Sequence, residues 1–145
     1  MSRRILIVLV AVVVVAIAGW QLAMRIFMAA PGDLDLSLSK KSETGLYAVS
    51  LMPEQAPIRE GVLQSFVLTV KMADGKPVAV SRIEIGGGMP EHGHGLPTEP
   101  RLTAALGDGK YRIEGFKFTM SGWWQLKFTI DAPQGRDEAD FNIVL

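Results

Sequence analysis

The chain of 145 residues contains no cysteine. Without cysteine, an exported domain cannot be cross-linked by disulfides. The same absence excludes thiolate zinc sites, blue-copper centres, iron–sulfur clusters and cysteine nucleophiles. Any bound metal must therefore be held by histidine, methionine, carboxylate or backbone groups, and the fold must be stabilised by its hydrophobic core.

An excess of charge is also lacking, because 15 Lys and Arg balance 15 Asp and Glu. The sequence therefore predicts no nucleic-acid partner and no acidic disordered tail. Phosphate-binding and serine-hydrolase motifs of the types G-x-x-x-x-G-K-[ST] and G-x-S-x-G are missing. The neighbouring acids Asp137 and Glu138 fall in a predicted turn, where we expect them to be solvated. No catalytic constellation emerges, so we predict that the protein is not an enzyme.

The N-terminus holds one long apolar run, from Ile5 to Met24, preceded by Arg3 and Arg4. A helix of this length spans about 30 Å, the thickness of the hydrocarbon layer of a bilayer. Secretory signal cores are shorter, about 7–15 residues. The run predicts an uncleaved transmembrane anchor over residues 1–30, with a cleaved signal peptide as the alternative. The two arginines favour a cytoplasmic N-terminus and an extracytoplasmic C-terminal domain.

Residues 31–45 are predicted to be a polar tether, and residues 46–145 an all-β extracytoplasmic domain. Segments of strand length alternate there with turn signals, and no stretch has a helical period. Seven such strands favour an immunoglobulin-like sandwich, with a small barrel as the alternative. The predicted strands cover residues 46–52, 62–72, 78–85, 101–106, 110–118, 120–130 and 139–145.

Two local details follow from the alternation of strand side chains. Trp124 is expected to point into the core, which places its neighbour Trp123 on the outer face. In residues 110–118 the apolar phase changes at Gly115, and a glycine at such a change indicates a bulge or a bend.

The segment IGGGMPEHGHGLPTEP, residues 85–100, is predicted to be a long loop, and it contains the only two histidines, His92 and His94. An extended backbone would place these imidazoles on one side, because a single residue separates them. Met89 lies three residues before His92. Thioether and imidazole ligands together favour copper, as thioether suits Cu(I) and imidazole suits Cu(II) or Zn(II). We therefore predict a copper site formed by Met89, His92 and His94.

Met120 is a candidate fourth ligand if its strand end lies beside the loop, and Glu91 is a less favoured oxygen ligand. Each of these residues also has a simpler interpretation. Histidine and glycine are common in exposed turns, and methionine often fills gaps in cores. For Met120, which is in phase with Trp124, the sequence favours core packing.

The order of anchor, all-β domain, GGGMPEHGHG and GKYRIEGFKFTMSGWWQLKFTI resembles the YtkA-like and FixH-like group of exported domains over about residues 45–145. The resemblance implies an immunoglobulin-like sandwich and a role in copper handling or in the assembly of membrane oxidase-type complexes. The residues that carry it are Met89, Pro90, His94, Gly95, Gly109, Tyr111, Phe118, Met120, Gly122 and Trp124.

Two functions remain open. The first is a single-pass inner-membrane protein whose periplasmic domain binds copper and delivers it to a membrane complex such as an oxidase. The second is a non-catalytic structural or assembly subunit of such a complex, with the histidine-containing loop and Trp123 as its contact surface. The lipid bilayer is a partner in both, and the sequence leaves the oligomeric state open.

Overall fold

The computed structural model describes residues 3–27 and 31–145, so the predicted domain boundary at residue 30 lies outside the described residues. A single helix, α1, covers Arg3–Phe27. Its apolar stretch Ile7–Met24 is long enough to cross a membrane, and none of it is buried against the rest of the protein. The helix is thus consistent with a membrane anchor or a signal sequence.

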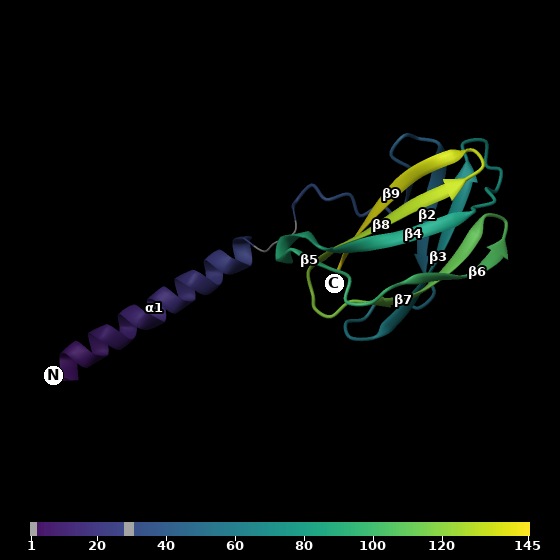
Figure 1. The fold of residues 1–145 in the computed structure, drawn as a ribbon. Coiled ribbons are helices and arrows are strands. Elements are labelled where there is room, and N and C mark those ends of the chain that lie inside the picture. Colours follow the sequence, from purple (N-terminus) through teal and green to yellow (C-terminus); the bar gives the residue numbers. More distant parts are fainter. Residues whose placement is uncertain (1–2, 28–30) are drawn as a thin grey trace.

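Residues 39–144 form a sandwich of two antiparallel sheets (Figure 1). One sheet has the order β1-β2-β3-β7-β6 and the other the order β5-β4-β8-β9. The strands are β1 Ser39–Lys41, β2 Tyr47–Pro53, β3 Leu63–Met72, β4 Arg82–Met89, β5 His94–Gly95, β6 Arg101–Gly107, β7 Lys110–Lys117, β8 Trp123–Ala132 and β9 Gly135–Val144, with a short 3-10 helix, η1, at Pro90–His92.

The core lies between the two sheets and follows from the two-residue period of the strands. In β8 Trp124, Leu126 and Phe128 are buried, whereas the residues that alternate with them are half-buried or exposed, and residues 64–70 of β3 alternate in the same way. The predicted outward position of Trp123 is confirmed, and its indole N–H donates to Asn142 Oδ1 at 2.9 Å.

The predicted β-sandwich is confirmed, and its seven predicted strands correspond to β2, β3, β4, β6, β7, β8 and β9. Two further short strands occur where none was predicted. β1 lies within the segment assigned to the tether and pairs with β2, so that Lys40 is opposite Val49. β5 lies within the predicted long loop and pairs with β4.

The predicted start of the third strand at residue 78 is wrong, because β4 begins only at Arg82. Val78 is buried, and its N–H donates to the carbonyl of Val70 in the opposite sheet at 3.1 Å. The chain then changes sheets, and Ser81 N–H donates to Asp131 O at 2.8 Å. Residues 78–81 are therefore the crossover between the two sheets.

The bulge predicted at Gly115 is confirmed. Glu114 is opposite Ser65 and Phe116 is opposite Gln64, so Gly115 is an extra residue in β7. Its φ of +99° is one that glycine adopts readily. The bulge restores an inward direction to Phe116, which is fully buried.

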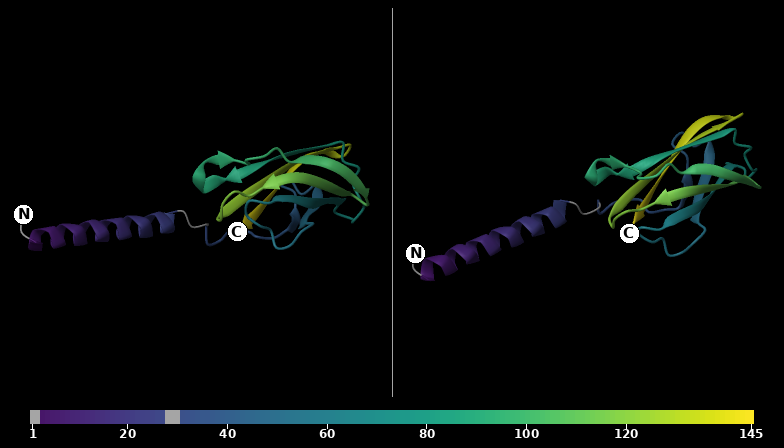
Figure 2. Two further views of the ribbon diagram at one scale, coloured as in Figure 1. Left: turned by 90° about the horizontal axis from the view of Figure 1, so that it is seen from below. Right: turned by 60° about the horizontal axis from the view of Figure 1, so that its bottom comes forward.

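One end of the sandwich receives the chain from α1, and we call it the tether end. It comprises residues 31–38, the connections 53–63, 89–101 and 117–123, and the C-terminal Leu145. Two hydrogen bonds fix the entering segment there, from Asn142 Nδ2 to Asp35 O and from Leu51 N–H to Leu38 O, each 2.9 Å long. Figures 1 and 2 show the β4–β5 hairpin and the C-terminus at this end.

Candidate metal site

The glycine-rich segment is the end of strand β4 and not a free loop, which corrects the expectation from sequence. Gly86, Gly87 and Gly88 pair with Lys127, Leu126 and Gln125 of β8. On its other side β4 pairs with β5, with Gly88 opposite Gly95 and Met89 opposite His94. The candidate ligands thus lie on a tight hairpin at the tether end of the sandwich.

Glycine is required here because neighbouring backbones approach closely. A Cβ atom added to Gly87 would lie 2.1 Å from the carbonyl oxygen of Gln125, and one added to Gly88 would lie 2.1 Å from that of His94. Both residues have positive φ, +129° and +153°. The glycines therefore let β4 keep its pairing with β8 while β5 comes close enough to bring His94 beside Met89.

A compact turn joins the two strands of the hairpin. η1 covers Pro90–His92, and Gly93 ends it with a left-handed φ of +67°. The N–H of Gly93 donates to Met89 O at 3.0 Å. The extended backbone that was expected between the two histidines is therefore not present. The turn nevertheless brings their imidazoles together, with ring centres 5.8 Å apart and ring planes at 44°.

The separation of the two imidazoles is compatible with a shared metal ion. An ion about 2.1 Å from an imidazole nitrogen lies about 3.2 Å from the ring centre, so two rings on one ion have centres at most about 6.4 Å apart. The observed 5.8 Å is within this limit. Both histidines are exposed, so solvent rather than protein surrounds much of each ring.

The ring of His94 is oriented by its surroundings. Its Nδ1 lies 3.0 Å from the carbonyl oxygen of Gly95, which can only accept a hydrogen bond, so Nδ1 carries the proton. In the neutral ring this leaves the lone pair on Nε2, the atom that would bind a metal. The ring also packs edge-to-face against Trp124, with centres 5.9 Å apart.

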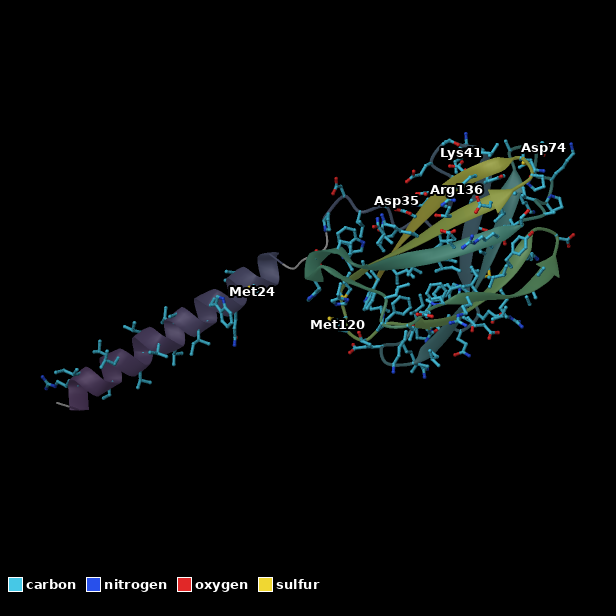
Figure 3. All side chains as sticks on the ribbon, viewed as in Figure 1. Met24, Asp35, Lys41, Asp74, Met120 and Arg136 are labelled. Carbon is cyan, nitrogen blue, oxygen red and sulfur yellow. The ribbon has the colours of Figure 1, made fainter. Side chains whose placement is uncertain are left out.

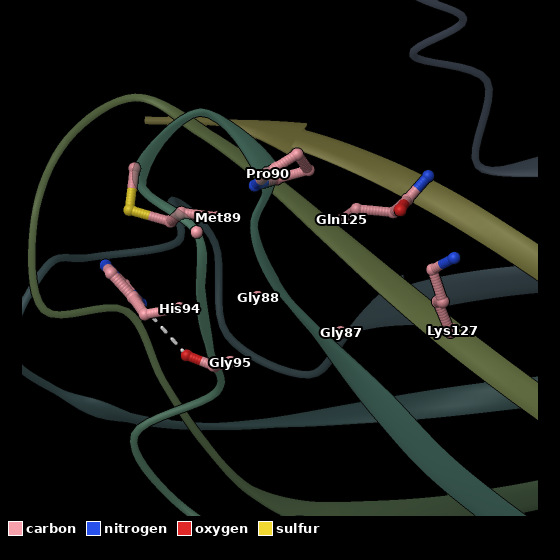
Figure 4. A pocket seen from close by; sticks show the side chains of 9 residues that line it. Gly87, Gly88, Met89, Pro90, His94, Gly95, Gln125 and Lys127 are labelled. Carbon is pink, nitrogen blue, oxygen red and sulfur yellow. Dashed lines mark hydrogen bonds between the residues drawn. The ribbon is translucent and has the colours of Figure 1, made fainter.

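Met89 is only 1% exposed and packs in the core, as the simpler interpretation expected. Because it is directly opposite His94 in an antiparallel pair, the two side chains share one face of the sheet. Figure 4 shows the Met89 sulfur and the His94 ring on the same side of the hairpin. The thioether is therefore placed both to fill the core and to face the imidazole.

The prediction that Met120 packs in the core is wrong, because this residue is 37% exposed. β8 begins at Trp123, and Gly122, with a φ of +121°, breaks the phase between Met120 and Trp124. The carbonyl of Met120 accepts a hydrogen bond from Trp124 Nε1 at 3.1 Å. This bond holds the Met120 loop beside the hairpin, at the same end of the sandwich.

Carboxylates contribute little to the site. No group of three or more His, Cys, Asp or Glu side chains is arranged to hold a metal within residues 3–27 and 31–145. Glu91, in the same turn as His92, has a solvent-inaccessible Oε2 atom with no hydrogen-bond partner in the described part of the chain. A metal ion bound at the hairpin would therefore have imidazole and thioether ligands.

A hollow of about 370 Å³ lies beside the hairpin. It forms where the glycines of β4 and β5 present no side chains. Gln125 and Lys127 project from β8 on the far side of the glycines from the Met89 sulfur (Figure 4). The hollow is lined by Gly87, Gly88, Met89, Pro90, Gly93, His94, Gly95, Gln125 and Lys127.

The expectation that Asp137 is solvated is wrong, since this residue is only 4% exposed. Its carboxylate accepts hydrogen bonds from Thr44 Oγ1 at 2.8 Å and from the N–H groups of Thr44, Leu46 and Glu138. Burial raises the pKa of Asp137, but the neighbouring Ser42 hydroxyl and the hydrogen bonds from Thr44 and Glu138 lower that pKa more strongly, to well below its usual value. Asp137 therefore anchors the β1–β2 connection to β9.

The fold and the hairpin define a β-sandwich domain that follows an apolar helix and carries a histidine pair at one end. A family model described as YtkA-like matches residues 40–129, which include the whole hairpin and Met120. The chain belongs to the YtkA-like family. Searches among curated proteins and among solved structures gave no match.

Proposed function

We propose that this protein is a membrane-tethered, extracytoplasmic copper-binding module that passes copper to a membrane complex such as an oxidase. α1 would be the anchor, and Arg3 and Arg4 before the apolar stretch favour a cytoplasmic N-terminus. The observation that carries the proposal is the hairpin geometry. It places Met89 directly opposite His94 and holds His92 with its ring centre 5.8 Å from that of His94.

The ligand chemistry supports copper over other metals. Two neutral imidazoles and one thioether form a soft to borderline set, and thioether sulfur is a ligand of Cu(I) but a poor one for magnesium or calcium. The protonated Nδ1 of His94 leaves Nε2 as its ligand atom. Met120, on the neighbouring loop, is the candidate fourth ligand.

The position of the histidines supports transfer more than storage. His92 and His94 are exposed, whereas Met89 is buried. A partner protein could therefore replace the imidazoles one at a time without opening the core. Attachment to the membrane would raise the effective concentration of the domain near a membrane-bound acceptor without any new contact.

Copper titration of residues 31–145 tests the proposal. This fragment contains the whole core, and α1 buries none of its apolar stretch against it, so the fragment is expected to fold alone. We expect one Cu(I) ion per chain in competition with a Cu(I) chelator. The double variant His92→Ala/His94→Ala should lose this binding, because it removes both imidazoles.

Methionine variants provide the matched control. Met89→Leu should weaken Cu(I) binding by at least about tenfold, whereas Met52→Leu, on the exposed outer face of β2, should leave it unchanged. Copper binding no tighter than that of free histidine would refute the proposal. That result would favour the alternative, a non-catalytic structural or assembly subunit that uses the hairpin as a contact surface.

A further inference from the structure

Exposed apolar side chains of the sandwich gather at the tether end. They belong to the entering segment, the end of β2, the start of β3, the loop before β8 and the end of β9, so they surround the end that carries the hairpin. Leu102 and Leu106 of β6 are the other exposed large apolar residues within 31–145. We call the first group the apolar rim; it consists of Leu36, Leu38, Met52, Val62, Leu63, Met120 and Val144.

The link to α1 is short. Four peptide units separate Phe27 from Pro31, a distance of at most about 14 Å. The N–H of Leu34 then donates to Pro31 O at 3.3 Å, which closes a turn of less than about 7 Å. The carbonyl oxygen of the next residue, Asp35, accepts a hydrogen bond from Asn142 Nδ2 near the end of β9. The end of α1 at Phe27 can therefore lie at most about 25 Å from Asp35, where the chain is fixed to the sandwich.

This reach determines which end of the domain lies near the membrane. Asn142 is seven residues from Gly135, which corresponds to about 24 Å along β9 to the opposite end. A domain that faced the membrane with that opposite end would need its link completely stretched. The tether end can approach the membrane with the link relaxed. Figure 3 shows Met120 at the tether end and Asp74 at the opposite end.

The charges at the tether end indicate what kind of surface the rim contacts. Its connections carry four acids (Glu54, Glu60, Glu91 and Glu99) and three separate bases (Arg59, Arg101 and Lys117), and the entering segment adds Asp33 and Asp35, so this end has no excess of positive charge. Electrostatic attraction to anionic lipid is therefore not available, and any attraction must come from apolar contact. Trp123, opposite Val144 and half-buried, adds an indole of the kind that is enriched at membrane interfaces.

We propose that the apolar rim rests in the interfacial layer of the bilayer that holds α1, so that the His92–His94 pair is held at the membrane surface. This inference depends on the proposed membrane anchoring by α1 but not on copper binding. Its physical basis is the burial of several half-exposed apolar side chains at a surface that the short link already brings close. Copper would then be offered to acceptors within the same membrane.

The absence of native cysteine allows a direct test with single-cysteine labels. Leu63→Cys places a fluorophore in the rim, where Leu63 is 62% exposed, and Asp74→Cys places it in an exposed turn at the opposite end. The full-length protein is reconstituted in phosphatidylcholine vesicles that contain lipid with a nitroxide quencher. We expect at least twofold stronger quenching at position 63 than at position 74, unchanged by salt.

Three outcomes can be distinguished. Equal quenching at the two positions, in protein that floats with the vesicles, would overturn the inference and leave the anchor intact. Protein that does not float would instead refute the proposed anchoring. Quenching at position 63 that falls as the protein density rises would show that a second copy covers the rim, which also overturns the inference. Unaltered tryptophan fluorescence of both variants before labelling verifies that they fold.

Discussion

Alanine at position 88 should detach the β4–β5 hairpin while the sandwich remains folded. The added Cβ would lie 2.1 Å from His94 O and 2.6 Å from Gly95 Cα, whereas ordinary contacts are 3.4–4 Å. Both neighbours are backbone atoms, so β5 must move away by more than about 1 Å. The chain would then lose the pairing of Gly88 with Gly95 and of Met89 with His94.

The size of the effect follows from the few contacts that β5 makes. Each lost hydrogen bond costs about 0.5–1.5 kcal/mol, so the loss of two amounts to about 1–3 kcal/mol of unfolding free energy. For a domain of this size, about 4 °C per kcal/mol gives a fall in Tm of about 4–12 °C. Copper affinity should fall at least about tenfold, because His94 no longer faces Met89.

The neighbouring glycines provide matched controls. Gly86→Ala meets nothing within 4 Å, so stability should change by less than about 1 kcal/mol and copper binding should persist. Gly87→Ala would collide with Gln125 O in the central β4–β8 pair and should cost more than Gly88→Ala. Urea denaturation followed by tryptophan fluorescence, together with copper titration, measures all three. Equal stability and equal copper affinity of Gly88→Ala and Gly86→Ala would show that the close backbone approach at Gly88 does not hold the hairpin in place.

Three further substitutions test the buried carboxylate, the placement of the thioether and the loop of Met120. Asp137→Asn should lower the free energy of unfolding by about 2 kcal/mol at neutral pH. Because the pKa of Asp137 is depressed in the folded protein, the ionised carboxylate contributes to the free energy of unfolding above the unfolded pKa of about 3.9, and this contribution is lost as the pH falls further. Equal urea midpoints of Asp137→Asn and the unsubstituted protein at pH 7 would contradict the predicted loss of stability. Gly122→Ala would place a Cβ 2.9 Å from Met89 Cε, so the thioether end of Met89 must move and copper affinity should fall. Unchanged copper affinity would contradict the proposed position of the Met89 sulfur beside the metal. Trp124→Phe removes the N–H that binds Met120 O and should cost about 1–3 kcal/mol in denaturant unfolding; a loss below about 0.5 kcal/mol would mean that this bond contributes little.

Local pattern was sufficient to predict most of the sandwich. The alternation of side chains correctly placed Trp124 inside and Trp123 outside, because both lie in one unbroken strand. The change of phase at Gly115 correctly located a bulge, since an extra residue in a strand must shift the phase. These features depend on neighbouring residues alone, and a single sequence contains them.

The candidate site was harder to predict, because it depends on contacts between distant backbones. Gly87 and Gly88 looked like loop residues, but they are paired with β8 and β5 at distances that only glycine permits. Gly122 interrupts the phase that seemed to connect Met120 with Trp124, so the buried methionine is Met89 and the exposed one is Met120.

Hydrogen bonds between residues far apart in the chain could not be predicted from the sequence either. The carboxylate of Asp137 is held by Thr44, which is 93 residues away in the chain. No local spacing connects the two, so the sequence suggested a solvated turn. The short strand β1 beside Ser42 was missed for the same reason, since its partner β2 alone defines it.

In the proposed site, Met89, His92 and His94 hold one copper ion together. X-ray absorption at the copper edge of the Cu(I)-loaded fragment 31–145 tests it most directly. We expect two imidazole nitrogens and at least one sulfur around the metal, with weaker sulfur scattering in Met89→Leu and loss of imidazole scattering in His92→Ala/His94→Ala. A spectrum without sulfur, or one that is identical in these variants, would contradict the claim.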